Sequence, residues 1–140
     1  MTELEHIRQQ RKKGTAEEFT PPELVNEMLD KLPPEVWIDP TKTFIDPAGG
    51  NGNFVIEVLK RKLKNNHTPL QALSTIYSVE LLQDNVEEMK QRLLDLLPPL
   101  SDDDLLKAKD IIDNNIIAHD ALTWDYENWR STKHKSKSLF

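Results

Sequence analysis

The sequence predicts an α/β protein with a small parallel sheet. Residues 43–45 form a β-prone run, which a glycine-rich turn connects to an amphipathic helical pattern. A β-prone run at 74–80 and a third strand followed by a turn at 115–122 come next, at intervals long enough to contain helices. Strands that alternate with helices are typical of a parallel sheet covered by helices.

The first strand, its turn and the start of the next helix are joined within residues 43–54. Three of the four glycines of the chain lie in this turn, at Gly49, Gly50 and Gly52. Glycines let a backbone turn sharply and approach a ligand closely. Asp46 and Pro47 end the strand, and a carboxylate here suits a cationic ligand group better than a pyrophosphate. The alternative is a turn whose glycines serve backbone geometry alone.

The turn, from Asp46 to Phe54, resembles motif I of S-adenosylmethionine-dependent methyltransferases. The form Asp-Pro-Ala-Cys-Gly-Ser-Gly-x-Phe occurs in amino methyltransferases that act on adenine in DNA. Gly49 stands in place of that cysteine and Asn51 in place of that serine. The resemblance implies a Rossmann-like methyltransferase fold and S-adenosylmethionine as cofactor.

A second resemblance lies upstream. Gly14 and the segment Phe19-Thr20-Pro21 are similar to motif X of the same family, which lies beside the methionine end of the cofactor. Motifs X and I occur in this order, at this short separation, in gamma-type adenine enzymes and type I modification subunits. Thr20 and Glu23 also match a capping box, which predicts a helix with Pro21 at its first position.

Acidic residues end all three predicted strands. Asp46 ends the first, Glu80 the second and Asp120 the third, and the carboxyl ends of parallel strands are where open α/β sheets bind ligands. Val79-Glu80-Leu81 and His119-Asp120-Ala121-Leu122 resemble motifs II and III of the family. The resemblance implies that Asp46 meets the methionine ammonium group, Glu80 the ribose hydroxyls and Asp120 the adenine amino group. An acidic helix start is the alternative for Glu80.

The resemblance therefore implies a set of cofactor-binding residues, in which Phe54 could equally be a core residue. The set is Phe19, Thr20, Pro21, Asp46, Pro47, Ala48, Gly49, Gly50, Gly52, Phe54, Glu80, Leu81, Asp120 and Ala121.

The catalytic motif of the family is missing. Adenine amino methyltransferases carry Asn/Asp-Pro-Pro-Tyr/Phe after the fourth strand, where it accepts from the amino group and stacks on the flipped base. The Pro-Pro pairs of this chain follow Thr20, Leu32 and Leu97, and none matches. The sequence after Leu122 is too short for strands four to seven. We expect a fold truncated after about three strands, with no catalytic residue and no activity from this chain alone.

The expected organisation is a basic N-terminal arm, 1–13, a cofactor-binding domain, 14–122, and an aromatic and basic tail, 123–140. In the family the strand order is 3-2-1, which leaves the first strand as an open edge. A second copy of the chain, a complementing methyltransferase subunit or the segment Trp124–Trp129 could cover that edge. The tail aromatic residues could alternatively stack on bases.

Composition limits the partners. The formal net charge of −6 argues against a large nucleic-acid footprint, so we expect DNA contact to be indirect or shared with a partner chain. The absence of cysteine excludes disulfides and thiolate metal sites, and we expect no metal. No membrane-spanning run or signal peptide is present, which predicts a cytoplasmic protein.

The sequence thus predicts the cofactor-binding half of a restriction-modification type adenine-N6 DNA methyltransferase. The alternatives are a non-catalytic regulatory module that binds S-adenosylmethionine and a generic nucleotide-binding protein. Elsewhere we expect His67 to be a solvent-exposed loop residue, Trp37 and Ile38 to pack against the sheet, and residues 102–106 to form a short helix or turn.

Overall fold

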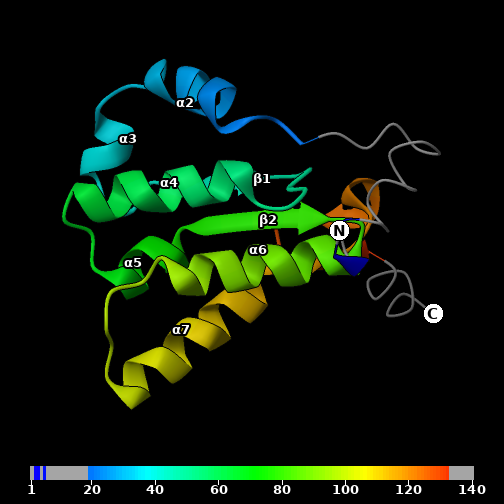
Figure 1. The fold of residues 1–140 in the computed structure, drawn as a ribbon. Helices are drawn as coiled ribbons and strands as arrows, with labels where there is room; N and C mark the ends of the chain where they lie inside the picture. The colour runs from blue at the N-terminus through cyan, green and yellow to red at the C-terminus, as the bar shows by residue number, and fades with distance from the viewer. Residues whose placement is uncertain (1, 4, 6–18, 133–140) are drawn as a thin grey trace.

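A computed structural model describes residues 2, 3, 5 and 19–132. Its main sheet has three parallel strands, β1 (Phe44–Asp46), β2 (Ile76–Glu80) and β3 (Ile116–Ala118), with β2 in the middle (Figure 1). Ile45 is in register with Tyr77, and Val79 with Ile117. The predicted α/β class, parallel strands and strand order are confirmed.

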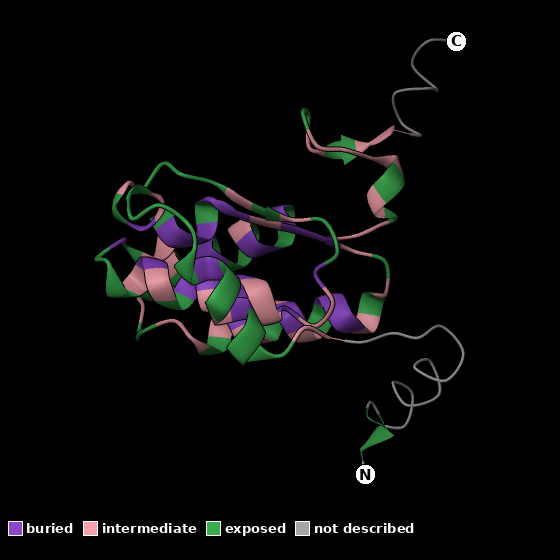
Figure 2. Ribbon diagram, turned by 90° about the horizontal axis from the view of Figure 1, so that it is seen from above, coloured by how far each residue is buried: buried purple, intermediate pink, exposed green. Residues whose placement is uncertain are grey.

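The helices pack on one face of the sheet. They are α2 (Pro22–Asp30), α3 (Glu35–Ile38), α4 (Asn53–Lys64), α5 (Pro69–Ser74), α6 (Gln83–Asp95) and α7 (Asp102–Asn115). Helices α4 and α6 cover the strands, α2 packs on α4, and α7 packs on α5 and α6 (Figure 1). The apolar spacing on α4 puts Val55, Val58 and Leu59 in the core. Buried residues concentrate where these helices meet the sheet (Figure 2).

A small hairpin covers part of the other face. The short helix η1 (Ala121–Thr123) leads into β4 (Trp124–Asp125), which pairs antiparallel with β5 (Arg130–Ser131). The Trp129 ring packs edge-on against Tyr77, with centroids 4.9 Å apart, and Trp129 Nε1 donates to the carbonyl oxygen of Asn114 at 2.6 Å. The aromatic segment therefore folds back onto the face of the sheet at β2, and not onto the open edge at β1 that it was expected to be able to cover.

The predicted capping box is wrong. Helix α2 begins at Pro22, after Pro21, and no side chain caps its first turn. The carbonyl oxygen of Thr20 instead accepts a hydrogen bond from Asn53 Nδ2 at 2.7 Å. Thr20 is therefore fastened to the glycine turn and lies outside the helix, whose first position is taken by Pro22.

Two other expectations are corrected near α5. His67 is only 6% exposed, and its Nε2 lies 2.6 Å from the carbonyl oxygen of Trp37. A capping box between Thr68 and Gln71, unrecognised in the sequence, starts α5 directly after His67 and fixes this part of the chain. Trp37 is buried as expected, whereas Ile38 is 68% exposed.

The region after residue 101 is more helical than expected. Helix α7 runs for 14 residues, because Ser101 caps it and Ala108 and Ile112 bury its inner face. The predicted basic arm, apart from residues 2, 3 and 5, and residues 133–140 of the tail lie outside the described residues. Within the described part of the chain, no helix is both long and apolar enough to cross a membrane.

Candidate ligand site at the glycine turn

The glycine turn connects β1 to α4 and packs directly on β2 and α6. The amide of Gly49 donates to the carbonyl oxygen of Val79 at 3.1 Å. A Cβ atom at Gly49 would collide with Ser78 Oγ and with the end of Met89. Gly52 has φ +98°, and a Cβ atom there would lie 2.7 Å from Met89 Cγ. Only glycine fits at these two positions, so the sequence signal has a steric cause.

Two carboxylates hold the backbone of the turn. Asp46 Oδ1 accepts from the amide of Ala48 at 3.1 Å, and Glu80 Oε1 accepts from the amide of Gly50 at 3.0 Å. These amides are therefore occupied by acceptors of the protein. A phosphate-binding loop needs such amides free for its ligand. The turn is consequently a poor cradle for a pyrophosphate.

Glu80 has a positioning role in addition to its place at the strand end. Its Oε2 accepts from the amide of Leu82 at 3.1 Å and from Asn85 Nδ2 at 2.9 Å, at the start of α6. One carboxylate thus ties the glycine turn to that helix. Oε1 accepts only the Gly50 amide among the hydrogen bonds of the described residues, so it has capacity for a further donor.

Asp46 and Asn51 each have a buried oxygen without a donor. Asp46 Oδ2 and Asn51 Oδ1 are inaccessible to solvent and have no hydrogen-bond partner among the described residues. Burial raises the pKa of the Asp46 carboxyl, and the nearby charge of Glu80 raises it further, against the hydrogen bond from Ala48. Buried acceptors without donors cost free energy, which a ligand with hydrogen-bond donors would recover.

Asp120 lies at the same end of the sheet. It is exposed, and its Oδ1 accepts from the amide of Leu122 at 2.9 Å. The Tyr126 hydroxyl donates to the carbonyl oxygen of Ala121 at 3.0 Å. Burial raises the pKa of Tyr126, and the charges of Asp120 and Asp46 raise it further. Both carboxylates therefore lie within electrostatic range of one phenol, and Asp46 lies within range of Glu80 as well.

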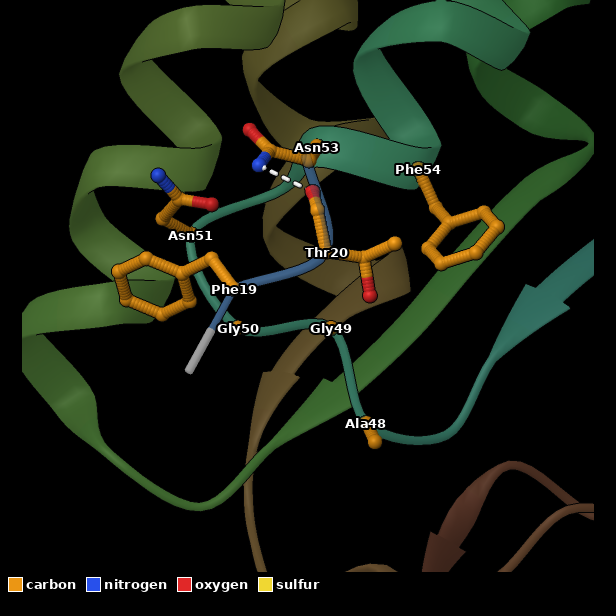
Figure 3. Close-up of a pocket in the computed structure, with 8 residues that line it drawn as sticks. All are labelled: Phe19, Thr20, Ala48, Gly49, Gly50, Asn51, Asn53 and Phe54. Carbon is orange, nitrogen blue, oxygen red and sulfur yellow. Dashed lines mark hydrogen bonds between the residues drawn. The ribbon is translucent and has the colours of Figure 1, made fainter. Parts of the chain in front are cut away.

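A small pocket lies over the turn. It has a volume of about 40 Å³ and is lined by Phe19, Thr20, Ala48, Gly49, Gly50, Asn51, Asn53 and Phe54 (Figure 3). The Phe19 ring lies over Gly50, where a Cβ atom would be 2.9 Å from Phe19 Cδ1. Ligand pockets usually measure about 300–1,000 Å³. In this conformation Phe19 and Thr20, which precede α2, lie over the turn.

The structure brings only some of the predicted residues into this pocket. Six of them line it: Phe19, Thr20, Ala48, Gly49, Gly50 and Phe54. Phe54 also stacks on Phe44 with centroids 6.5 Å apart, so it contributes to the core too. The other predicted residues do not line it: Pro21 precedes α2, Pro47 and Gly52 belong to the turn, Ala121 opens η1, and Leu81 is 67% exposed after Glu80.

The predicted set omits three residues that shape the site, Asn51, Asn53 and Arg92. Arg92 Nη1 donates to the carbonyl oxygen of Asn51 and to Asn53 Oδ1, both at 2.9 Å. The side-chain amide of Asn53 in turn donates a hydrogen bond to the carbonyl oxygen of Thr20 (Figure 3). Arg92 lies 39 residues after Asn53, on a helix rich in charged residues, so nothing local in the sequence marks it.

No metal centre is evident, since the described residues contain no group of three or more His, Cys, Asp or Glu side chains that could hold a metal ion. Comparisons of the chain with models of protein families, with curated proteins and with solved structures find no match.

Proposed function

We propose that this chain binds S-adenosylmethionine at the glycine turn, in a Rossmann-like domain that forms the cofactor-binding half of an adenine-N6 DNA methyltransferase of restriction-modification type. One observation carries the proposal: the turn has two buried oxygens, Asp46 Oδ2 and Asn51 Oδ1, that lack donors. S-adenosylmethionine offers an ammonium group, ribose hydroxyls and an adenine amino group as donors, and its sulfonium is cationic. A carboxylate-rich site without free loop amides suits such a ligand.

Each acid at the strand ends has a task in this proposal. Asp46 Oδ2 accepts from the ammonium group, and the negative field of Asp46 and Glu80 favours the sulfonium. Glu80 Oε1 accepts from a ribose hydroxyl while it keeps hold of the Gly50 amide. Asp120 accepts from the adenine amino group through Oδ2, while its Oδ1 accepts from the amide of Leu122. Binding at full depth requires the Phe19 ring to move off Gly50.

The methyl acceptor must be supplied from outside this chain. The bound cofactor supplies an electrophilic methyl group, and its transfer to an amine depends mainly on in-line positioning. The sequence has no Asn/Asp-Pro-Pro-Tyr/Phe segment to hold the acceptor base. A partner chain that adds strands beside β1 and contacts DNA would complete the site, in keeping with the net charge of −6.

A second candidate is a non-catalytic module that binds S-adenosylmethionine and regulates a complete enzyme. The absence of the acceptor segment favours it, because cofactor binding would then be the whole function. A generic nucleotide-binding protein is less favoured, because the amides of Ala48 and Gly50 are already bound to carboxylates.

Isothermal titration calorimetry of the chain with S-adenosylmethionine tests the cofactor assignment. We expect saturable binding that Asp46→Asn and Glu80→Gln each weaken by about tenfold or more, as expected for a charge-assisted hydrogen bond. Asp110→Asn, which removes an exposed acid of α7, is the matched control and should bind like the wild type.

Competition separates the candidates. ATP or NAD that displaces S-adenosylmethionine at equal concentration would favour the generic nucleotide-binding protein. A folded chain that binds none of the three would refute the cofactor assignment. Binding followed by methylation of adenine-containing DNA only after a partner chain is added would distinguish the split enzyme from the regulatory module.

A further inference from the structure

A chain of hydrogen bonds joins helix α6 to the residues that lie over the glycine turn. Arg92 Nη1 donates to the main-chain carbonyl oxygen of Asn51 and to Asn53 Oδ1, both at 2.9 Å. Asn53 Nδ2 donates to the carbonyl oxygen of Thr20 at 2.7 Å, the dashed line in Figure 3. Phe19, the residue before Thr20, lines the pocket over the turn. The position of these two pocket residues is therefore connected to α6 through one asparagine side chain.

The chemistry of the three groups sets the orientation of that asparagine. A guanidinium group only donates, so the atom of Asn53 that faces Arg92 is its amide oxygen. The amide nitrogen then faces Thr20, whose carbonyl oxygen only accepts. All of these hydrogen bonds are partly buried, so water competes with them less than it would at the surface. Arg92 thus keeps the donor of Asn53 directed at Thr20.

Helix α6 gives this arrangement a fixed base. Met89 and Leu93, which flank Arg92 along the helix, are no more than 1% exposed. Met89 also packs on the glycine turn, where a Cβ atom at Gly52 would lie 2.7 Å from its Cγ atom. Arg92 therefore projects from a helix that is packed against the core and against the turn itself.

The segment before α2 is held more weakly. Within the described part of the chain, Thr20 makes no hydrogen bond other than the one with Asn53. Pro21 and Pro22, which follow it, have no amide hydrogen to donate and are exposed. The hydrogen bond between Asn53 and Thr20 is consequently the point at which this segment can separate from the turn.

We propose that Arg92 and Asn53 form a latch that keeps Phe19 and Thr20 closed over the glycine turn. Arg92 is the positioning residue, and Asn53 releases the segment when its hydrogen bond to Thr20 breaks. The latch itself does not depend on the identity of the ligand, whereas its control of cofactor entry rests on the proposed function.

The latch controls access to a buried acceptor. Asn51 Oδ1 is inaccessible to solvent and has no donor among the described residues, and the closed pocket measures only about 40 Å³. A ligand with hydrogen-bond donors can reach this oxygen only after the segment above the turn moves. Breaking one hydrogen bond at Thr20 allows that movement while Arg92 still holds the turn.

Thiol labelling measures the opening, because the chain has no cysteine of its own. Asn51→Cys is the reporter, since Arg92 contacts the main-chain oxygen of this residue and its side-chain oxygen has no partner. A thiol there reacts with an aromatic disulfide reagent when the segment is open, so the labelling rate follows the open population. Ala48→Cys, at an exposed position of the same turn, gives the rate of an accessible thiol.

Asn53→Asp breaks the latch without removing the support of the turn. The carboxylate still accepts from Arg92 but cannot donate to Thr20. An acid is also favoured at the first position of α4, where the helix dipole attracts negative charge. With the reporter present we expect labelling about five- to tenfold faster, as for loss of one hydrogen bond, and no decrease in the urea midpoint. Asn114→Asp, which adds the same charge at an exposed position of α7, is the matched control.

A second pair of variants tests the role of Arg92. Arg92→Met should raise the labelling rate about threefold, because Asn53 then loses the donor that orients it. Arg92→Lys keeps a donor at this position and should restore most of the slow labelling. Gln91→Met, on the exposed face of α6, is the control for the apolar substitution and should label like the reporter alone.

Three outcomes would overturn the latch. One is a reporter that labels as fast as Ala48→Cys, which would show that the segment is open in the free chain. Another is an unchanged rate after Asn53→Asp. The third is a rate that rises only in proportion to a fall in the urea midpoint, which would assign Arg92 and Asn53 to structural support. If the rates follow expectation but calorimetry detects no binding of S-adenosylmethionine, the latch stands and the cofactor assignment alone is refuted.

Discussion

The two ends of α4 use polar residues in opposite ways. At the N-terminal end, the glycine turn leaves Asp46 Oδ2 and Asn51 Oδ1 buried without donors. At the C-terminal end, Lys62 is 1% exposed and donates to the carbonyl oxygen of Lys42 at 2.8 Å. Arg61 there contacts Asn26 and Asp30 and lies over the Trp37 ring. At the N-terminal end, buried acceptors are left without donors. At the C-terminal end, the polar side chains of α4 bind α2 and the segment that leads into β1.

Size alone would favour the C-terminal end of α4 as a ligand site. A groove of about 530 Å³ lies at the C-terminal end, lined by Asn26, Asp30, Trp37, Arg61, Lys64 and Asn65, whereas the pocket over the turn measures about 40 Å³. Arg61, the central cation of the groove, is already engaged by α2. The proposal of a site at the glycine turn therefore rests on unsatisfied buried polar atoms and not on pocket size.

The largest expected effect is a steric clash in the glycine turn, at the N-terminal end of α4. Gly49→Ala should destabilise the fold by about 2–3 kcal/mol, because the new Cβ atom displaces Ser78 and Met89 in a packed core. Urea denaturation measures the change. Ala48→Ser, at the exposed neighbouring position, is the control and should stay within about 0.5 kcal/mol. A tolerated alanine at Gly49 would contradict the close packing of the turn on β2.

At the C-terminal end, the buried Lys62 should make stability depend on alkaline pH. Burial lowers its pKa below the ordinary value of 10.5, against the attraction of Asp39. Between the lowered pKa and 10.5 the unfolded chain binds more protons than the folded one, so the free energy of unfolding rises with pH across that window. Lys62→Met should remove this rise and stabilise the protein at neutral pH by about 1 kcal/mol. Denaturation curves at several alkaline pH values measure it, and an unchanged slope would contradict it; Lys60→Met, on the exposed side of α4, is the control.

The sequence predicted the first end better than the second, for physical reasons. The glycine turn is local, because backbone geometry and steric limits act within a few residues of Gly49 and Gly52. The strand ends could also be predicted, since β1 ends at Asp46, β2 ends at Glu80, and Asp120 follows the end of β3 by two residues. Contacts between residues that are distant in the sequence could not be predicted in this way.

Those distant contacts decided the details. Thr20 carries a capping-box pattern, but its carbonyl oxygen accepts a hydrogen bond from Asn53, 33 residues away. His67 looked like a loop residue, but Trp37, 30 residues away, holds its ring. Arg92 reaches the turn across 41 residues. Such pairings depend on how α2, α3 and α6 pack on α4, which no local pattern specifies.

A smaller effect should separate ligand binding from stability. Asp46→Asn removes a partly buried charge, so it should stabilise the fold by up to about 1 kcal/mol at neutral pH while it weakens binding of S-adenosylmethionine. The raised pKa of Asp46 means that the folded chain binds more protons than the unfolded one between 3.8 and the raised value. Wild-type stability should therefore fall as pH rises through that window, and the variant should lack this fall. Thermal melts from acid to neutral pH measure the difference, and a destabilised variant would assign Asp46 to structure alone.

The smallest expected effect on stability concerns the segment above the turn. Phe19 is half-buried and lies over Gly50, so Phe19→Ala should cost less than about 1 kcal/mol. Removing the ring opens the space beside Asn51, and the association rate of S-adenosylmethionine should rise several-fold if ring displacement limits entry. Stopped-flow fluorescence of the tryptophans can follow binding, with Leu24→Ala, an exposed apolar residue on α2, as the control. An association rate that is slower than that of the control, or equal to it, would show that Phe19 does not obstruct the site in the free chain. The pocket of about 40 Å³ would then have to open by movement of the glycine turn itself.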